Sequence, residues 1–558
     1  MKKLFAIFMM TVLLLSVAAC GDRYGDDTLV DTSKSQLYVG TYDGGLKTAW
    51  ITKAAARFEA LYADTEFEPG KKGVEIIITP NKNYGGTTFR SDILSSREEV
   101  FFIELSDYYE LMTYDQTNRL LDITDAVTTP LTEYGESKSI EDKMYASDVS
   151  FFKTSEGKYY GLPFYEATYG IFYDVELFEQ QNFYFAADGT SFVTSASDTR
   201  SNGPDGIAGT SDDGLPATYA DFYKLCDRMV ANGVVPLNWA GSVKNGTTNF
   251  LMLSLWADYE GAEQMQLNYS FNGTATNLVS SFGATGPATE TVEIGYSNGY
   301  ELQRQAGKYY SLEFMENILS NSSYYIASDT FSTGYDQITA QTDFLKGRYD
   351  TTGQRDVYGM YVDGTWWFNE AERAFQDLES SPTGNKQARK VAIMPLPKAT
   401  ADNLGSYTYM NSYLTECVIK SNIASSKVDL AKAFLRFVHT DESLSEFTVT
   451  TNVTRPFEYE LTESDEANMT YYLKSIWEVH QNSDIVVPYS ANNLYLSNVN
   501  NFLRADGFYA SRVGNTNYLY YLEAFRAQSS ISAQDYFNGC ATRWSKEAWD
   551  NAYSRFYS

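Results

Sequence analysis

The chain has 558 residues, a formal net charge of −29 and only two histidines. So acidic a chain repels phosphate backbones, and we expect no nucleic-acid partner. The scarcity of histidine argues against zinc centres, His-based catalytic triads and most general-base chemistry. Aromatic residues make up 15% of the chain. Tyr and Trp combine a flat apolar face with a hydrogen-bonding edge, and this pairing suits sugars as ligands.

The first twenty residues form a secretion signal. Two lysines precede an apolar run from Leu4 to Leu15, which is too short for the roughly twenty residues that span a bilayer. The sequence Val-Ala-Ala-Cys that ends at Cys20 resembles the bacterial lipobox, in which the signal is cut before a cysteine that carries the lipid. We therefore expect a signal peptide over residues 1–19, lipidation of Cys20 and a flexible polar tether over 20–36.

An α/β pattern follows the tether. Short apolar runs at residues 36–40, 74–79 and 100–105 are typical of buried parallel strands. A stretch from Trp50 to Tyr62 repeats apolar side chains at helical spacing. Strands that alternate with helices predict an α/β lobe.

A second α/β series begins near Gly161. Residues 170–173 are predicted to form a strand, and residues 219–232 form an amphipathic helix that begins with a capping box of Thr218 and Asp221. Another amphipathic helix is predicted over residues 430–438. The chain is long enough for two lobes of ordinary domain size.

Two polar stretches interrupt this second series, at about residues 186–215 and 243–351. The first contains Asp205, Asp212 and Asp213 among glycines that permit sharp turns, a pattern that resembles calcium loops. Their spacing does not match an EF-hand, and a solvated acidic loop is the alternative. Apart from this structural Ca²⁺ we expect no cofactor. The second stretch is expected to add helices and long loops to one lobe.

Four stretches, taken in order, resemble the family 1 extracellular solute-binding proteins, which are carbohydrate-binding lipoproteins of ABC importers related to maltose-binding protein. The order and spacing of these stretches carry the resemblance, which extends from Leu37 to the C-terminus. They are GLPFYEATYGIFYD (161–174), GMYVDGTWW (359–367), VAIMPLP (391–397) and AFLRFVHTDE (433–442).

The resemblance implies an α/β protein with two lobes, a periplasmic-binding-protein-like fold of type II, with the ligand cleft between the lobes. By analogy, the N-terminal lobe comprises residues 37–164 and 399–450. The C-terminal lobe comprises residues 165–398 and 451–558. Ligands favour clefts at domain interfaces, so the physical expectation agrees with this arrangement.

The resemblance also implies which residues contact the ligand. Trp366 occupies the position where an aromatic face stacks on the sugar, and Trp367 beside it is a second candidate. Glu166 stands at the crossover between the lobes, preceded by Tyr165, where a carboxylate can accept hydrogen bonds from sugar hydroxyls. A structural salt bridge is the alternative for Glu166, because an unpaired buried charge is costly.

Four further residues are candidates for the same cleft. Asp43 and Asp107 follow predicted strands, where they would reach a ligand or instead cap a helix. Trp239 ends a short predicted strand on the side whose loops face the cleft. Arg455 would close the pocket with a fork of hydrogen-bond donors.

We therefore expect a monomeric, lipid-anchored receptor on the extracytoplasmic face of the cell membrane. It would bind a carbohydrate, deliver it to an ABC transporter permease and catalyse no reaction. Two alternatives remain open. A cell-surface glycoside hydrolase would need two carboxylates flanking an aromatic cleft. A surface adhesin or structural lipoprotein would use the polar middle segment as its interaction surface.

Overall fold

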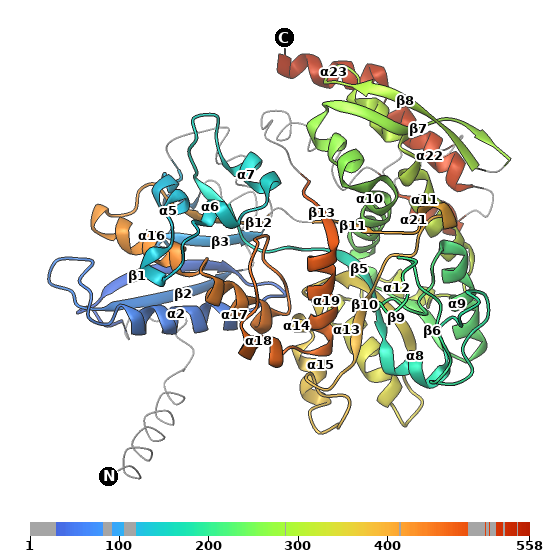
Figure 1. The fold of residues 1–558 in the computed structure, drawn as a ribbon, viewed down its shortest axis with the longest axis horizontal. Helices are drawn as coiled ribbons and strands as arrows, with labels where there is room; N and C mark the ends of the chain where they lie inside the picture. Colours follow the sequence, from blue (N-terminus) through green and yellow to red (C-terminus); the bar gives the residue numbers. More distant parts are fainter. Residues whose placement is uncertain are drawn as a thin grey trace.

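The computed structural model describes residues 30–81, 92–104, 119–284, 286–411, 415–488, 508, 513, 520–527, 531–543 and 545–557. Two lobes, each built around its own β-sheet, lie side by side along the longest axis (Figure 1). The predicted signal peptide, Cys20 and Asp107 lie outside the described residues. Within the described residues, no helix is both long and apolar enough to cross a membrane.

The first lobe contains a five-stranded sheet in the order β2-β1-β3-β12-β4. Strand β1 runs parallel to β2 and β3, whereas β12 pairs antiparallel with β3 and β4. The first three strands form where the sequence has its continuous apolar runs, as expected for strands covered on both faces. The strands are β1 (Ser35–Tyr42), β2 (Val74–Asn81), β3 (Val100–Glu104), β4 (Gly161–Pro163) and β12 (Thr415–Ile419).

Helices from two separate parts of the chain, residues 49–152 and 425–467, cover this sheet. Helix α2 buries the apolar face that its periodicity predicts, and Trp50 on it packs edge-on against Phe102 of β3, 5.0 Å between ring centroids. The helices are α2 (Ala49–Leu61), α5 (Thr124–Thr128), η2 (Thr132–Tyr134), α6 (Ile140–Lys143), α7 (Ala146–Phe152), η7 (Ser425–Lys427), α16 (Val428–Phe437), α17 (Asp441–Thr451) and α18 (Glu463–Ala467).

The second lobe is built on a four-stranded sheet in the order β10-β5-β9-β6. Tyr169 at the start of β5 pairs with Gly364 at the end of β9. The ends of β6 and β10 lie at this same edge, because β6 runs parallel to β9 and β10 runs antiparallel to β5. The strands are β5 (Tyr169–Asp174), β6 (Val235–Asn238), β9 (Tyr358–Gly364) and β10 (Val391–Met394).

The capping box predicted at the start of α9 is confirmed, since Thr218 and Asp221 each bond the other's backbone N–H. Helix α10 bends at Gly261, whose φ of 77° is readily adopted by glycine. The helices of this lobe are α8 (Val175–Gln181), α9 (Tyr219–Ala231), η3 (Gly241–Val243), α10 (Lys244–Ser270), η4 (Gly299–Arg304), α11 (Ala306–Ser320), α12 (Ala327–Thr330), α13 (Gln337–Lys346), η5 (Gly347–Tyr349), α14 (Trp367–Glu370), α15 (Glu372–Asp377), η6 (Ala401–Asn403), α19 (Tyr471–Asn482), α21 (Tyr521–Ala527) and α22 (Ala533–Arg543).

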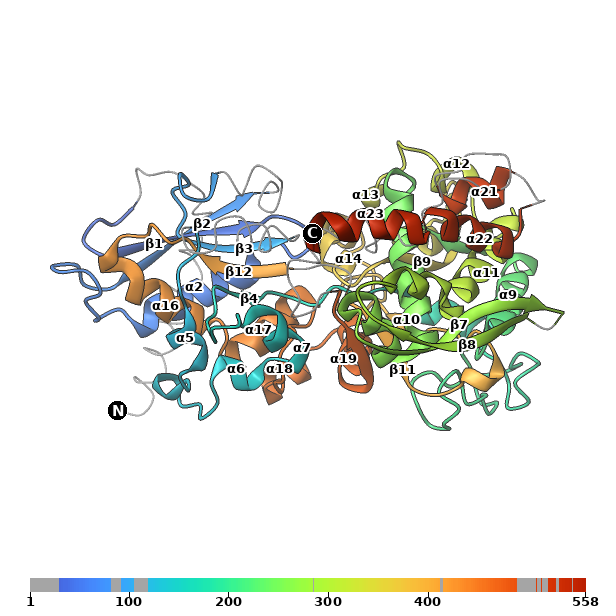
Figure 2. The same cartoon turned by 90° about the horizontal axis from the view of Figure 1, so that it is seen from above.

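The polar stretch 243–351 contains helices, as predicted, and also a β-hairpin of β7 (Gly273–Gly283) and β8 (Gly286–Ile294). The hairpin and the C-terminal helix α23 (Lys546–Tyr557) lie at one end of the second lobe (Figures 1 and 2). They share a small core of their own, which consists of Leu267, Phe271, Ala275, Leu278, Ile294, Leu302 and Trp549.

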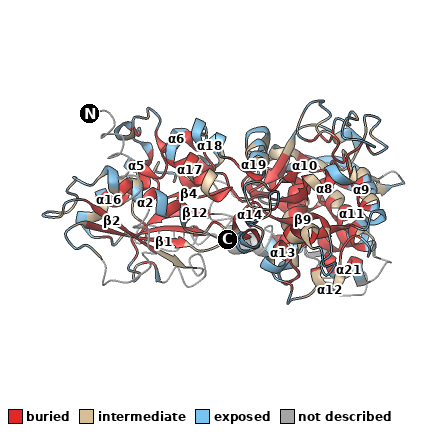
Figure 3. Cartoon of the chain, turned by 90° about the horizontal axis from the view of Figure 1, so that it is seen from below, coloured by how far each residue is buried: buried red, intermediate tan, exposed pale blue. Residues whose placement is uncertain are grey.

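The chain crosses between the lobes more than once. Beside the first crossing, Thr168 pairs with Asn411. Strand β11 (Tyr407–Met410) pairs with β13 (Ser483–Val486) and contacts α10 of the second lobe. In both ribbon views α19 lies where the lobes meet (Figures 1 and 2), and buried residues concentrate inside each lobe (Figure 3).

The lobe boundaries remain a prediction, but two stretches pair across them. Strand β11, assigned to the first lobe from the sequence, packs on the second. Phe457, assigned to the second lobe, bridges to Met144 of the first. Both contacts arise from strand pairing between distant segments, which no local pattern encodes.

Candidate ligand site between the lobes

A cluster of aromatic rings lies at the edge of the second sheet that faces the first lobe. Trp366, directly after β9, meets Tyr169 edge-on with 5.2 Å between ring centroids. Tyr169 in turn stacks on Phe250 of α10, with centroids 4.8 Å apart and planes 21° apart. A Cβ placed on Gly364 would lie 2.2 Å from Cη2 of Trp366, so the glycine lets the indole lie across the strand end. Trp366 is half-buried, and the cluster offers a ligand partly accessible aromatic surface.

The loop after β1 brings the first lobe onto this cluster. A Cβ placed on Gly45 would lie 2.3 Å from Cδ1 of Trp366, so the backbone of this loop touches the indole. The side-chain amide of Asn369 donates hydrogen bonds to the carbonyl oxygens of Gly45 (3.0 Å) and Leu46 (2.9 Å). Half-buried Asp43 lies two residues before Gly45. The lobes therefore touch where Asp43 and Trp366 were predicted to meet a ligand.

A buried carboxyl group holds the turn that carries Trp366. Asp363, at the end of β9, accepts hydrogen bonds from the Tyr361 hydroxyl (2.5 Å) and the Gly364 N–H (2.8 Å). Burial raises the pKa of Asp363 to about 7. Neither Asp363 nor Asn369 was predicted from the sequence. The one available signal was their position on either side of the Trp-Trp pair.

Glu166 lies at the first crossing of the chain between the lobes, which we call the hinge, and is buried, with 3% of its surface exposed. Its Oε1 accepts a hydrogen bond from the Thr454 hydroxyl (2.9 Å) and lies 3.0 Å from Nδ1 of His480 on α19. The Tyr145 hydroxyl lies 3.4 Å from the same imidazole. Burial, with a contribution from Glu166, raises the pKa of Tyr145 above its ordinary value. Glu166 thus links the first crossing to Thr454 and to His480 on α19, which agrees with the structural role given as its alternative. Its contact with a ligand stays a prediction.

Three of the remaining candidates are aromatic side chains enclosed in the cores of the lobes. Tyr165 packs edge-on against Phe164. The indole N–H of Trp239 donates to the carbonyl oxygen of Thr330 (3.0 Å). Trp367 is 0% exposed and packs on Tyr361, Phe172 and three further rings. These positions favour a packing role, because enclosed side chains offer a ligand no surface.

Arg455 is also enclosed, in the first lobe. It donates a hydrogen bond to Nε2 of His439 (2.9 Å), and its guanidinium lies 5.0 Å from the ring centroid of Phe447. Burial lowers the pKa of Arg455 to about 10 and lowers that of His439 well below its ordinary value. These contacts favour a packing role for Arg455, and its predicted role in closing the pocket stays a prediction.

The acidic loop uses its carboxylates as internal acceptors. Asp212 accepts from the Tyr407 hydroxyl, the Thr210 hydroxyl (2.6 Å) and the Asp205 N–H (3.0 Å). Asp213 accepts from the Gly209 N–H (2.8 Å). Among the described residues, no group of three or more His, Cys, Asp or Glu side chains is arranged to hold a metal ion. The calcium site stays a prediction.

The model of one protein family, described as bacterial extracellular solute-binding protein, matches residues 47–443, which is more than half of the chain. The chain belongs to this family. The family resemblance found in the four sequence stretches is thereby confirmed. No curated protein matches the chain.

Solved structures show the same two-lobed fold. A chitin oligosaccharide binding protein is 15% identical, with a TM-score of 0.52 over 94% of this chain and 100% of that one. The GacH receptor of Streptomyces glaucescens, solved without ligand and with acarbose, is 11% identical, with a TM-score of 0.52 over 93% and 99%. RafE in complex with raffinose is 12% identical, with a TM-score of 0.50 over 91% and 100%. The predicted fold class is confirmed, and both the family and these neighbours are binding proteins.

Proposed function

We propose that this protein captures a sugar or oligosaccharide between its lobes and delivers it to an ABC transporter permease. The observation that supports this most directly is the contact of Gly45 with Trp366 beside Tyr169, in a member of a solute-binding family. Aromatic faces stack on the apolar faces of sugar rings, and carboxylates such as Asp43 accept hydrogen bonds from sugar hydroxyls.

The neighbours in structure support a carbohydrate as the ligand class. The proteins compared above bind a chitin oligosaccharide, acarbose or raffinose according to their descriptions. Identities of 11–15% support only a shared fold. The ligand class is therefore inferred from the aromatic cluster around Trp366 in this chain. A half-buried tryptophan beside a stacked Tyr–Phe pair suits a sugar ring better than it suits a small ion.

The mechanism is a shift between open and closed arrangements of the lobes. A ligand that contacts both Trp366 and the loop of Asp43 binds the closed state more tightly, and so shifts the population toward it. The two hydrogen bonds from Asn369 to that loop further stabilise the closed state. We propose that the permease recognises the closed form, and that no covalent chemistry occurs.

We also propose that the protein works outside the cytoplasm, as a monomer held by lipid on Cys20. A lone acyl chain binds membranes only marginally, so stable anchoring needs more than one chain on that cysteine. The polar tether that follows would let the lobes move relative to the membrane.

Thermal unfolding with a panel of mono- and oligosaccharides tests the binding proposal. A ligand at a hundred times its Kd adds about 2.7 kcal/mol to the free energy of unfolding. We expect at least one sugar to raise Tm, Trp366→Ala to abolish that rise, and the sugar to be recovered unchanged. Phe67→Ala is the control, since Phe67 is a half-buried aromatic residue that packs on Tyr62 within the first lobe.

Two outcomes would contradict the proposal. If no sugar gives a Tm rise that depends on Trp366, the cleft does not bind carbohydrate, and the adhesin alternative gains support. If the sugar is consumed during incubation, the glycoside hydrolase alternative gains support instead.

A further inference from the structure

A cavity of about 590 Å³ lies in the second lobe, between β10, α19 and the acidic loop. Its volume falls within the roughly 300–1,000 Å³ of small-molecule sites. It shares no lining residue with the Gly45–Trp366 contact. Tyr173 in its wall stands four residues beyond Tyr169 on β5, which corresponds to about 13 Å along a strand. The cavity is therefore separate from the cleft between the lobes.

Three tyrosine rings line this cavity. Tyr173 is buried on β5, Tyr407 is half-buried on β11, and Tyr471 is 41% exposed at the start of α19. The Tyr407 hydroxyl donates to Asp212, and the Lys398 ammonium lies 4.3 Å from the Tyr407 ring centroid. These contacts hold Tyr407 in place, so that part of the wall is formed before any ligand enters.

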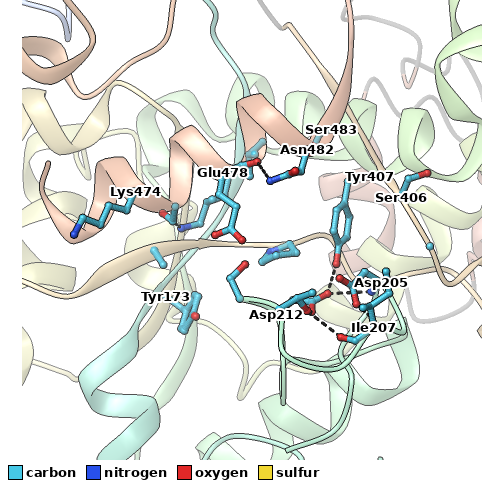
Figure 4. Close-up of a pocket in the computed structure, with 18 of the residues that line it drawn as sticks. Tyr173, Asp205, Ile207, Asp212, Ser406, Tyr407, Lys474, Glu478, Asn482 and Ser483 are labelled. Atoms are coloured by element: carbon cyan, nitrogen blue, oxygen red, sulfur yellow. Dashed lines mark hydrogen bonds between the residues drawn. The ribbon is translucent and has the colours of Figure 1, made fainter. Parts of the chain in front are cut away.

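Polar groups reach the same space from opposite sides. Glu478 points from α19 toward the space between Tyr173 and Tyr407, whereas Asp205 and Asp212 lie across from it (Figure 4). The lining also contains neutral polar side chains, which are those of Thr210, Ser211, Ser406, Ser475, Asn482 and Ser483.

The charge of the lining selects among ligands. The lining contains three carboxylates, those of Asp205, Asp212 and Glu478, and one ammonium group, that of Lys474. The excess negative charge opposes an anion, because like charges brought together cost free energy. The same negative charge favours ligands with hydroxyl or ammonium groups, because carboxylates accept hydrogen bonds from both.

We propose that this cavity is a second ligand site, which binds an uncharged or amine-bearing sugar against the rings of Tyr407 and Tyr471. Saccharides have the apolar faces that such rings contact and the hydroxyl groups that Glu478 and Asn482 bind. The site does not depend on the cleft, so the protein would hold two sugar molecules at once.

Calorimetric titration in a Trp366→Ala background tests this site, because that substitution impairs the cleft. The probes are glucose, maltose, raffinose, N,N′-diacetylchitobiose and glucosamine, with glucose 6-phosphate as the anionic comparison. We expect at least one uncharged or amine-bearing probe to bind this variant, and glucose 6-phosphate to bind at least tenfold more weakly than glucose or glucosamine.

Substitutions of two exposed residues that line the cavity, called the rim variants, then test whether the probe binds there. Tyr471→Ala and Glu478→Gln should each weaken the remaining binding at least tenfold while preserving the fold, since both side chains are exposed. Glu156→Gln, at an exposed glutamate outside the cavity, should leave it unchanged. Circular dichroism and Tm without ligand verify that each variant is folded.

The proposal is overturned if no probe binds the Trp366→Ala protein, if the rim variants leave the binding unchanged, or if glucose 6-phosphate binds as well as glucose. The cleft proposal fails separately, when no binding to the parent protein depends on Trp366. The two sites can therefore succeed or fail independently.

Discussion

The side chain of Asn369 holds the backbone of Gly45 across the space between the lobes. Its Nδ2 lies 3.0 Å from the Gly45 carbonyl oxygen, and it also donates to the Leu46 carbonyl. The Lys386 ammonium donates to Asn369 Oδ1 (3.1 Å), which fixes the orientation of the amide. Asn369 is 9% exposed, so these three hydrogen bonds are largely shielded from water. A single side chain thus supports the closed arrangement beside Trp366.

Asn369→Ala is expected to weaken sugar binding. Two hydrogen bonds that exist only when the lobes touch are lost, at about 0.5–1.5 kcal/mol each. The expected increase in Kd is about tenfold, with a shift of the scattering profile toward an open form at equal sugar concentration. Asn422→Ala is the control, because its amide donates to Leu94 within the first lobe. An unchanged Kd would show that closure does not depend on this contact.

The role of Glu166 can be resolved by separating stability from affinity. Glu166→Ala leaves the Thr454 hydroxyl and the His480 imidazole without their buried acceptor, and should lower the free energy of unfolding by about 1–3 kcal/mol. If Glu166 acts through the hinge alone, Glu166→Gln should change stability and leave the Kd for sugar within about twofold. A large loss of affinity with normal stability would instead support direct contact with the ligand. Urea unfolding and calorimetry measure the two quantities.

Local features of the fold could be predicted from the sequence, whereas the environment of each candidate residue could not. The capping box of Thr218 and Asp221 and the apolar face of α2 depend on neighbours a few positions away, and both form as expected. One partner of Glu166 is His480, 314 positions later. No spacing rule predicts such a pair. It arises when the chain crosses between the lobes and packs α19 beside the hinge.

The same argument explains the candidates that lie in the cores. Trp366 and Trp367 are neighbours in sequence, yet one is half-buried at the lobe contact and the other is 0% exposed. Arg455, expected from the sequence to close the pocket, packs over Phe447 and bonds to His439. Burial is decided by which elements cover a position, and for these residues the covering elements come from distant parts of the chain.

Stability is expected to fall as the pH rises toward neutrality. Burial raises the pKa of Glu260 from 4.5 to about 7. Between these two pKa values the folded state keeps a proton that the unfolded state releases. The contribution of Glu260 to the free energy of unfolding is therefore fully present below pH 4.5 and is lost as the pH rises from about 4.5 to 7. One such group changes the free energy of unfolding by up to about 1.4 kcal/mol per pH unit.

Glu260→Gln replaces the carboxyl with a neutral group of similar shape, and should flatten this slope between pH 5 and 7. Burial raises the pKa of Asp258 to about 6 and that of Asp363 to about 7, so part of the slope should remain. Glu460→Gln, at an exposed position, should leave the slope unchanged. Urea unfolding at half-unit pH steps measures it, and equal slopes in the parent and Glu260→Gln proteins would show that Glu260 ionises normally.

The hairpin of β7 and β8 should unfold separately from the sugar-binding lobes when Trp549 is removed. Trp549 is 1% exposed, donates from its indole N–H to the Tyr296 carbonyl (2.7 Å) and packs on Phe271 with 5.3 Å between centroids. Substitution of a buried tryptophan by alanine costs about 3–5 kcal/mol. This small core is distinct from the main one, so Trp549→Ala should raise amide exchange in the hairpin while the Kd for sugar stays unchanged. Trp50→Ala, in the core of the first lobe, should lower global stability instead. A loss of sugar binding in folded Trp549→Ala protein would show that the hairpin and the cleft are coupled.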